Sequence, residues 1–175
     1  DALLVAGMMI TMLRHADRVK VACLAQLVNV IAPIMTSDTG AWKQTIYHPF
    51  EMISNYGRGT VLNTVVNAPV YESIHGDAPY LDSVCTMNEE DETLTLFVVN
   101  KDLEDSMELT SDLRQFQGYQ VKEHIVLTHS DLKAINTEEN PNNVAPVKTG
   151  NAKVTDGILE AVLCNKSFHV IRLAK

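Results

Sequence analysis

The longest apolar run in the sequence extends from Val19 to Met35, and it shows almost no alternation of polar and apolar positions. A strand that is covered on both faces has this pattern, and such strands lie in parallel sheets. The run predicts a buried strand over Val19–Ala25, with Gln26 at its carboxyl end. A parallel strand needs parallel neighbours, yet no other segment has the same pattern. The first third of the chain therefore looks like the closing part of a larger α/β domain.

The segments on either side of this run have helical spacing. Over Ala2–Leu13, apolar residues recur every three or four positions and cover nearly the whole circumference, which predicts a helix buried on most sides. A shorter helix is predicted over Phe50–Tyr56, because Pro49 suits the first turn of a helix and Gly57 ends the segment. A helix followed by a buried strand is the repeating unit of an α/β barrel.

From Thr60 onward, short strand-like segments alternate with turn residues. Thr93–Asn100 alternates at its start, as a half-buried strand does, and Asn88–Asp91 forms a charged turn before it. Such spacing predicts an antiparallel β-sandwich. The polar segment Ile135–Gly150 predicts a long loop, of the kind that is either mobile or in contact with another element. The expected strands are 60–71, 80–87, 93–100, 106–110, 119–128, 152–155, 159–163 and 168–173.

These patterns together predict a mainly β chain. We expect an antiparallel β-sandwich preceded by the last helix–strand–helix piece of a (β/α)8 barrel. The character of the sequence changes near Gly57. Residues 1–56 are therefore interpreted as the terminal piece of the barrel domain, and residues 57–175 as a C-terminal β-sandwich domain.

The charge balance narrows the classes of partner. The chain has 22 acidic and 14 basic residues, and its formal net charge is −8. Nucleic acids and anionic membranes both require a basic face, so the chain is expected to bind neither. Neither apolar run reaches the roughly 18 uncharged residues of a membrane span, and no signal peptide is recognised. The three scattered cysteines, Cys23, Cys85 and Cys164, indicate a reduced, cytoplasmic protein.

No motif in the sequence assembles a complete active site. Most carboxylates lie in turns, where charged residues are usually solvated, and no two are placed as the pair of a glycosidase. No serine or cysteine has the context of a nucleophile. His124 and His129 lie five positions apart on or just after one strand, hence on opposite faces. We therefore expect no metal site, no cofactor and no catalytic residue in this chain.

Gln26 is the polar residue whose position suggests a function. The carboxyl ends of barrel strands carry substrate-binding and catalytic groups. The alternative is that Gln26 and Asn29 only satisfy backbone groups where the strand ends, as buried amides usually do. The residue pattern leaves both interpretations open.

Three stretches together resemble one enzyme family. They are similar to the C-terminal part of α-L-arabinofuranosidases of glycoside hydrolase family 51, and looser similarity extends over the rest of the chain. The three stretches are Arg14–Lys20 (RHADRVK), Cys23–Ile34 (CLAQLVNVIAPI) and Trp42–Phe50 (WKQTIYHPF), and the looser matches are Tyr80–Ser83, Val99–Asp105, His124–Leu127 and Val170–Leu173.

The resemblance implies a retaining exo-glycosidase that removes arabinofuranosyl groups from arabinan and arabinoxylan fragments. It also implies that both catalytic glutamates lie on barrel strands that precede Asp1. Gln26 matches the family's sugar-binding glutamine at the end of the last barrel strand, where it would hydrogen-bond a furanose hydroxyl. Trp42 lies in the loop region beyond that strand and would border the pocket. His48 stands where the family often has tyrosine, so no role is carried over to it.

Three interpretations follow. The favoured one is the C-terminal portion of an arabinofuranosidase that acts on arabinose-containing oligosaccharides and is inactive without the rest of its barrel. The alternatives are a carbohydrate-binding module and a structural or oligomerisation domain. Aromatic residues make up only 6% of the chain and are scattered, which disfavours a binding module. The resemblance also implies a homo-oligomer, since the family tends to form oligomers. We further expect the isolated chain to dimerise or aggregate, because unpaired strand edges and an apolar helix face associate.

Overall fold

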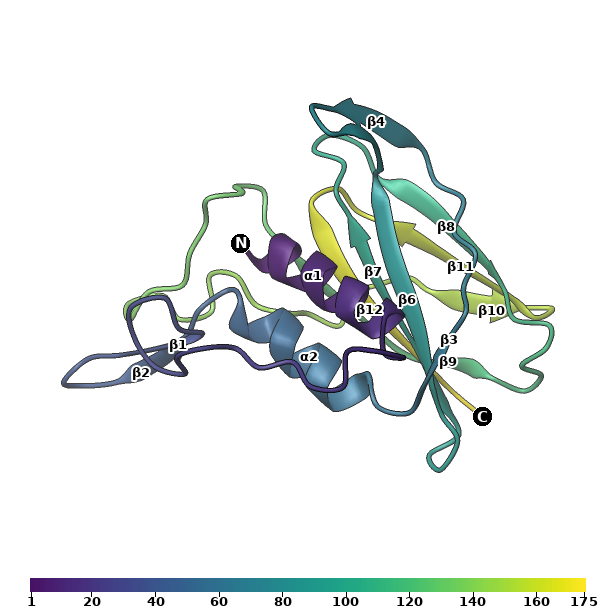
Figure 1. Ribbon diagram of the computed structural model, residues 1–175, viewed down its shortest axis with the longest axis horizontal. Helices are drawn as coiled ribbons and strands as arrows, with labels where there is room; N and C mark the ends of the chain where they lie inside the picture. Colours follow the sequence, from purple (N-terminus) through teal and green to yellow (C-terminus); the bar gives the residue numbers. More distant parts are fainter.

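The computed structural model describes residues 1–175 as two helices that lie against one side of a layered β-structure (Figure 1). Strands hold 38% of the residues and helices 13%, so the chain is mainly β, as predicted. Neither helix is long and apolar enough to cross a membrane. The helices are α1 (Ala2–Arg14) and α2 (Tyr47–Tyr56), and the strands are β1 (Ile34–Thr36), β2 (Ala41–Lys43), β3 (Thr60–Leu62), β4 (Val70–Ser73), β5 (Gly76–Pro79), β6 (Leu81–Asn88), β7 (Thr93–Asn100), β8 (Met107–Asp112), β9 (Gln120–Thr128), β10 (Lys153–Thr155), β11 (Ile158–Leu163) and β12 (Ser167–Ala174).

Two antiparallel sheets form the body of the chain. The larger sheet has the strand order β3–β6–β7–β12–β9 and the smaller one β10–β11–β8, while β1–β2 and β4–β5 form separate hairpins. Strand β12 pairs with β7 on one side and with β9 on the other, so that Val170 lies opposite both Phe97 and Ile125. Strands that are distant in sequence therefore meet in the larger sheet. The predicted antiparallel sandwich is confirmed.

Each face of the larger sheet has its own apolar core. On β7, Phe97 shares one core with Ile10 of α1 and Phe168 of β12. The next residue, Val98, shares the other core with Leu159 of β11. This alternation is the period of two of a strand. Strand β7 is buried on both faces, rather than half-buried as its sequence indicated, because helices cover one face and the smaller sheet covers the other.

Helix α1 has one exposed stripe, while most of its other residues are buried or half-buried. Ala6 and Ile10, about one turn apart, are fully buried, whereas Leu4 and Met8 are exposed by 68% and 51%. This helix, which was expected to be buried on most sides, therefore leaves one apolar stripe exposed. An apolar helix face in water is a surface suited to contact with another structure.

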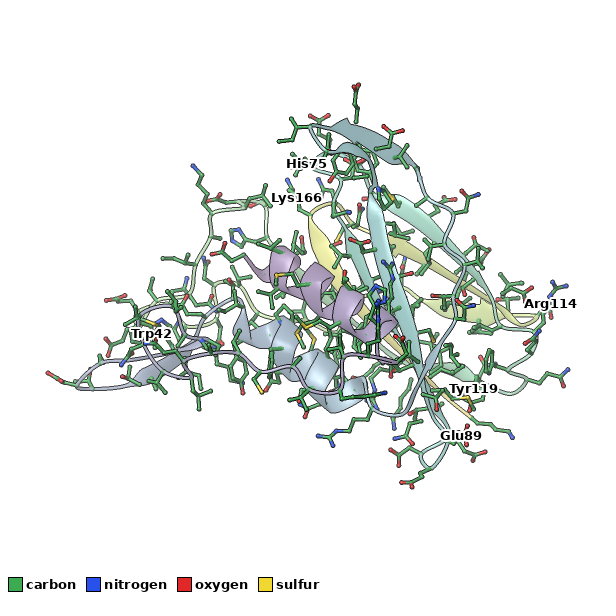
Figure 2. All side chains as sticks on the ribbon, viewed as in Figure 1. Trp42, His75, Glu89, Arg114, Tyr119 and Lys166 are labelled. Carbon is green, nitrogen blue, oxygen red and sulfur yellow. The ribbon has the colours of Figure 1, made fainter.

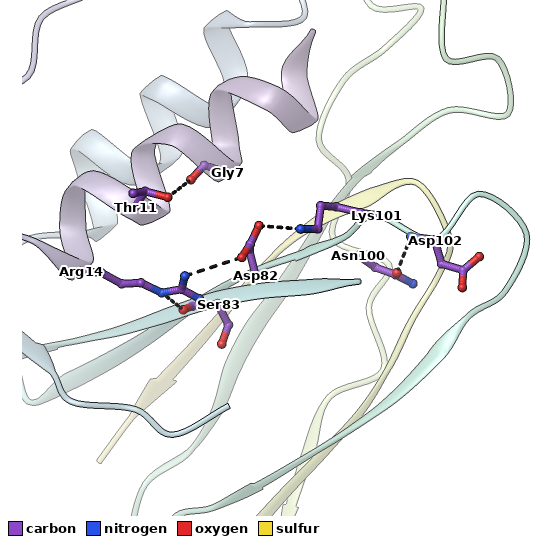
Figure 3. A network of polar contacts seen from close by, with 8 residues as sticks. All are labelled: Gly7, Thr11, Arg14, Asp82, Ser83, Asn100, Lys101 and Asp102. Atoms are coloured by element: carbon purple, nitrogen blue, oxygen red, sulfur yellow. Dashed lines mark hydrogen bonds and ion pairs between the residues drawn. The ribbon is translucent and has the colours of Figure 1, made fainter. Parts of the chain in front are cut away.

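Polar contacts fix the end of α1 to the larger sheet (Figure 3). Arg14 donates from Nε to the backbone oxygen of Ser83 at 3.0 Å, and its guanidinium pairs with Asp82 at 3.6 Å. Lys101 pairs with the same carboxylate at 3.1 Å. Asp82, which lies on β6, thus pairs both with the end of the helix and with Lys101, the residue that follows β7.

The strand expected over Val19–Ala25 is not formed. Residues 19–25 have irregular backbone, and Val21 is 78% exposed. A parallel strand depends on hydrogen bonds from its neighbours, and no strand of this chain pairs with residues 19–25. The helices predicted before and after this segment are present, so the strand is the missing member of the predicted helix–strand–helix piece.

The other differences from the sequence predictions concern short strands. The expected strand 60–71 is divided into β3 and β4, because residues 63–69 leave the sheet. Strands β1, β2 and β5 have only three or four residues each, too few for a periodic pattern to be recognised. The remaining predicted strands agree with the observed ones to within two residues at each end.

Candidate functional site

Gln26 lies on the irregular segment that joins α1 to β1. Its side chain is exposed, and its backbone φ of 58° falls in the left-handed region. Asn29 and Val30 have similar φ values of 63° and 59°. Such a conformation is an outlier for a β-branched residue, and each instance costs about 1–3 kcal/mol. Three left-handed residues within five mark this segment as backbone of raised conformational energy.

The same segment exposes large apolar side chains. Leu27, Val30 and Ile31 are all mostly accessible to solvent. Contiguous apolar surface of this kind marks a contact site for another protein segment. Gln26 is therefore a polar group within an apolar surface.

Asn29 fixes this segment to the β1–β2 hairpin. Its Oδ1 accepts a hydrogen bond from the backbone N–H of Thr36 at 2.8 Å, and its Nδ2 donates to Thr36 Oγ1 at 2.8 Å. Its backbone N–H donates to the oxygen of Ile34 at 2.8 Å. The interpretation that this amide satisfies backbone groups near the end of the apolar run is confirmed for Asn29. The exposed amide of Gln26 has no comparable role.

Trp42 lies on β2, opposite Met35 of β1, and is half-buried. Figure 2 shows Trp42 at the end of the molecule that the hairpin forms, with Arg114 at the opposite end. The indole Nε1 donates to the backbone oxygen of Asn136 at 3.2 Å. The long loop predicted over residues 135–150 was expected either to be mobile or to contact another element. The bond to Trp42 shows that it contacts β2.

Gln26 lies on the segment that Asn29 joins to the β1–β2 hairpin, and Trp42 lies on that hairpin. Neither residue lines one of the main cavities of the chain. A cavity of 780 Å³ opens elsewhere, between Leu62, Thr110 and Phe116. Sugar-sized ligands are bound in concave sites where several polar groups converge. Gln26 and Trp42 therefore do not form a concave binding site by themselves.

A buried histidine pair lies in the larger sheet, on β9 and β12. His124 Nε2 lies 2.8 Å from His169 Nδ1, and His169 Nε2 lies 2.7 Å from Ser167 Oγ. The backbone N–H of Ala152 donates to His124 Nδ1 at 3.1 Å, so this nitrogen carries no proton. Each ring consequently donates from Nε2. The Ser167 hydroxyl donates in turn to the backbone oxygen of Cys164.

This pair is structural. Burial lowers the pKa of His124 to about 4, and burial together with the neighbouring His124 lowers the pKa of His169 to about 3. Neutral rings whose four nitrogens are all bonded cannot take a proton from a substrate. No group of three or more His, Cys, Asp or Glu side chains is placed to hold a metal ion.

The sequence analysis missed the histidine pair because it depends on strand register. Strand β9 pairs with β12 so that His124 lies opposite Ile171, which brings the two rings to the same face. The only available signal was a histidine inside each of two apolar strand segments.

Comparison with known proteins identifies relatives of this chain. The family model described as alpha-L-arabinofuranosidase C-terminal domain matches residues 1–167. The intracellular exo-alpha-(1->5)-L-arabinofuranosidase 1 of Bacillus subtilis (strain 168) is 52% identical over 177 residues, and the match covers 100% of this chain and 35% of the relative. A protein with the same activity in its name, from Halalkalibacterium halodurans, is 51% identical with the same coverage of each chain.

A solved structure has the same fold. The family 51 alpha-L-arabinofuranosidase of Bifidobacterium longum superposes with a TM-score of 0.91 at 34% identity, over 98% of this chain and 34% of that chain. This chain therefore spans about a third of the length of the relatives that it matches. The match of the family model to nearly the whole chain shows that the chain belongs to the α-L-arabinofuranosidase C-terminal domain family.

Proposed function

We propose that this chain is the C-terminal part of a retaining α-L-arabinofuranosidase. The enzyme removes terminal arabinofuranosyl groups from arabinan and arabinoxylan oligosaccharides. The observation that carries the proposal is the 52% identity, over the whole chain, to an enzyme named for its exo-α-(1→5)-L-arabinofuranosidase activity. Because the second relative bears the same activity in its name, α-(1→5)-linked arabino-oligosaccharides are the substrates to test first.

In this proposal residues 1–56 close a catalytic barrel and residues 57–175 form the appended sandwich. The exposed apolar side chains of residues 19–31 and the left-handed backbone at Gln26, Asn29 and Val30 support it. Neighbouring barrel strands would cover these side chains and hold the segment extended. The catalytic glutamates are on those strands, outside this chain.

Gln26 and Trp42 are the residues that this chain contributes to the substrate site. The exposed amide of Gln26 can donate to and accept from a furanose hydroxyl. Trp42 presents a half-buried indole from the adjoining hairpin and borders the same pocket. Both residues act by binding and orienting the sugar.

The proposal also covers location and assembly. The names of the two relatives place those enzymes inside the cell, and we extend this location to the present protein. We also extend to it the expectation of a homo-oligomer, since the exposed side chains of Leu4 and Met8 offer an apolar contact surface on α1.

Replacement of Gln26 in the full-length enzyme tests the proposed site. Gln26→Ala is expected to lower kcat/KM for α-(1→5)-arabinotriose by about twofold to tenfold, the usual effect of one lost neutral hydrogen bond. Gln117→Ala is the matched control, because this exposed glutamine lies far along the chain next to Gly118. Equal kcat/KM values for wild type, Gln26→Ala and Gln117→Ala would remove Gln26 from the substrate site.

A further inference from the structure

We infer that Asn136 and Glu138, on the long loop of the sandwich, are positioning residues for the substrate site. They hold the β1–β2 hairpin so that Trp42 borders the arabinofuranose pocket. This inference rests on the proposed function, and it gives the sandwich a direct part in substrate binding.

Asn136 joins the loop to the hairpin through a buried amide. Its side chain is 1% exposed, and its Nδ2 donates to the backbone oxygens of Lys43 at 2.9 Å and of Val144 at 3.0 Å. Its Oδ1 accepts from the backbone N–H of Val144 at 2.7 Å. Lys43 directly follows Trp42, whose indole donates to the backbone oxygen of the same asparagine. One residue therefore fixes both the backbone and the side chain at this end of β2.

Glu138 makes a second connection, at the turn of the hairpin. One carboxylate oxygen, Oε1, accepts hydrogen bonds from Ser37 Oγ and from Thr39 Oγ1, each at 2.6 Å. These two hydroxyl donors lower the pKa of the Glu138 carboxyl, which therefore stays charged and accepting near neutral pH. Glu138 thus restrains residues 37–39, while Asn136 restrains the end of β2.

The loop that carries these residues is itself fixed to the sandwich. Val147 exchanges backbone hydrogen bonds of 2.8 and 2.9 Å with Val126 of β9. Lys148 then pairs with Glu123 of β9 at 2.7 Å. The loop thereby connects β9 to a hairpin formed by residues 34–43, far earlier in the sequence.

Contacts within the hairpin alone would hold it less firmly. Strands β1 and β2 have three residues each, and an isolated hairpin of this size is at best marginally stable. The hydrogen bonds to Asn136 and Glu138 supply the missing restraint. A side chain that binds a sugar needs such support, because a small displacement is enough to weaken the contact.

A double-mutant cycle in the full-length enzyme tests the inference. Glu138→Ala removes the acceptor for both hydroxyls, Glu138→Gln keeps an acceptor oxygen, and Glu139→Ala is the matched control because this neighbour is exposed and takes no part in these bonds. Asn136→Asp removes the two Nδ2 donors. Each is measured alone and with Trp42→Phe, by KM and kcat on α-(1→5)-arabinotriose and by melting temperature.

We expect Glu138→Ala and Asn136→Asp each to raise KM by about threefold to tenfold. Glu138→Gln and Glu139→Ala are expected to stay within about twofold of wild type. In the Trp42→Phe background, Glu138→Ala and Asn136→Asp should add no further rise, because their effect passes through Trp42. Asn136→Asp is buried and also lowers the melting temperature, whereas the exposed Glu138→Ala leaves it unchanged.

Two results would overturn the inference. One is a Glu138→Ala variant whose KM equals that of the wild type, provided that the wild-type enzyme hydrolyses the substrate. The other is a rise in KM that is undiminished in the Trp42→Phe background, because a general structural effect would behave in this way. A wild-type enzyme without arabinofuranosidase activity would instead contradict the proposed function, and the positioning role would fall with it.

Discussion

Gly150, Ala152 and the ring of His124 show how single residues fix a loop to the sheet. A Cβ atom at position 150 would lie 1.9 Å from His124 Cγ, so only glycine lets the loop pass this close to the ring. The N–H of Gly150 donates to the backbone oxygen of His124 at 3.2 Å, and the N–H of Ala152 donates to His124 Nδ1 at 3.1 Å. A proton added at Nδ1 would replace an acceptor by a donor and break this contact. The hydrogen bond between Ala152 and the His124 ring therefore forms only while His124 is neutral.

Stability is therefore expected to decrease in mild acid. The unfolded chain binds protons at the ordinary histidine pKa of about 6.5, whereas in the folded chain the pKa is about 4 for His124 and about 3 for His169. Between these values the unfolded state holds more protons, so the free energy of unfolding falls as pH decreases from about 6.5 toward 4, and is constant above that range. Thermal unfolding should give a Tm lower by about 5 °C or more at pH 5 than at pH 7.5.

Three carboxyl groups with lowered pKa values affect stability at a lower pH than the histidine pair does. Those of Asp102, Asp112 and Glu138 have lowered pKa values, so the stability that they contribute is lost only below about pH 4. His75→Gln, at an exposed histidine, should leave the pH dependence unchanged. A Tm that is constant from pH 7.5 to pH 5 would contradict the buried, neutral pair.

At the scale of elements, the sequence was most informative where a periodic pattern ended at a clear turn. Strand β7 was predicted with its observed limits, because alternation begins at Thr93 and charged residues flank both ends. The strand over Val19–Ala25 was predicted from an apolar run that does suit a buried strand, but no strand of this chain pairs with it. Hairpin β1–β2 was missed because its strands have three residues each, too few for a periodic pattern, and because its contact with Asn136 joins segments distant in sequence. A single sequence indicates which segments favour a strand, whereas pairing depends on the partners available.

The connections between strands depend on a second buried amide, that of Asn100 at the end of β7 (Figure 3). Its Nδ2 lies 3.1–3.2 Å from the backbone oxygens of Asp105, Leu163 and Cys164, and its Oδ1 accepts from the N–H of Asp102. Asn100→Ala should lower the free energy of unfolding by about 2–3 kcal/mol, because buried carbonyl groups lose their donor. Urea unfolding measures this change.

Asn165 provides the matched control for this prediction. Its Nδ2 also donates to two backbone oxygens, those of Leu103 and Glu104, but at the surface, where water can replace it. Asn165→Ala should therefore cost less than about 1 kcal/mol. Equal losses for the two variants would show that burial of the Asn100 amide is not what makes it important.

At the scale of the whole molecule, one side of the chain has a well-buried core and the other side exposes apolar side chains. The two sheets bury a full core between them, and the helices close the second core. Residues 19–31 and the outer face of α1 remain apolar and exposed. The sequence predicted the antiparallel sandwich that forms this core. Gln26 and Trp42 were predicted as substrate-binding residues through the family resemblance, since no pattern within the chain alone identifies a sugar site.

The exposed apolar surface should make the isolated 175-residue chain associate. Leu4 and Met8 on α1, together with Leu27, Val30 and Ile31, present it to solvent. Light scattering at increasing concentration should show dimers or larger species. Replacement of both Leu4 and Met8 by Glu should shift the population toward monomer. A wild-type chain that stays monomeric at high concentration would contradict this prediction.

The central claim is that this chain is a necessary but incomplete part of an arabinofuranosidase, and hydrolysis of an aryl α-L-arabinofuranoside tests it most directly. The rate is measured for the full-length protein and for the purified 175-residue chain at equal concentration. We predict turnover by the full-length protein and none by the 175-residue chain, because the proposed function assigns the carboxylate pair that cleaves the glycosidic bond to the rest of the protein. Turnover by the chain alone, or no turnover by the full-length protein, would contradict this account.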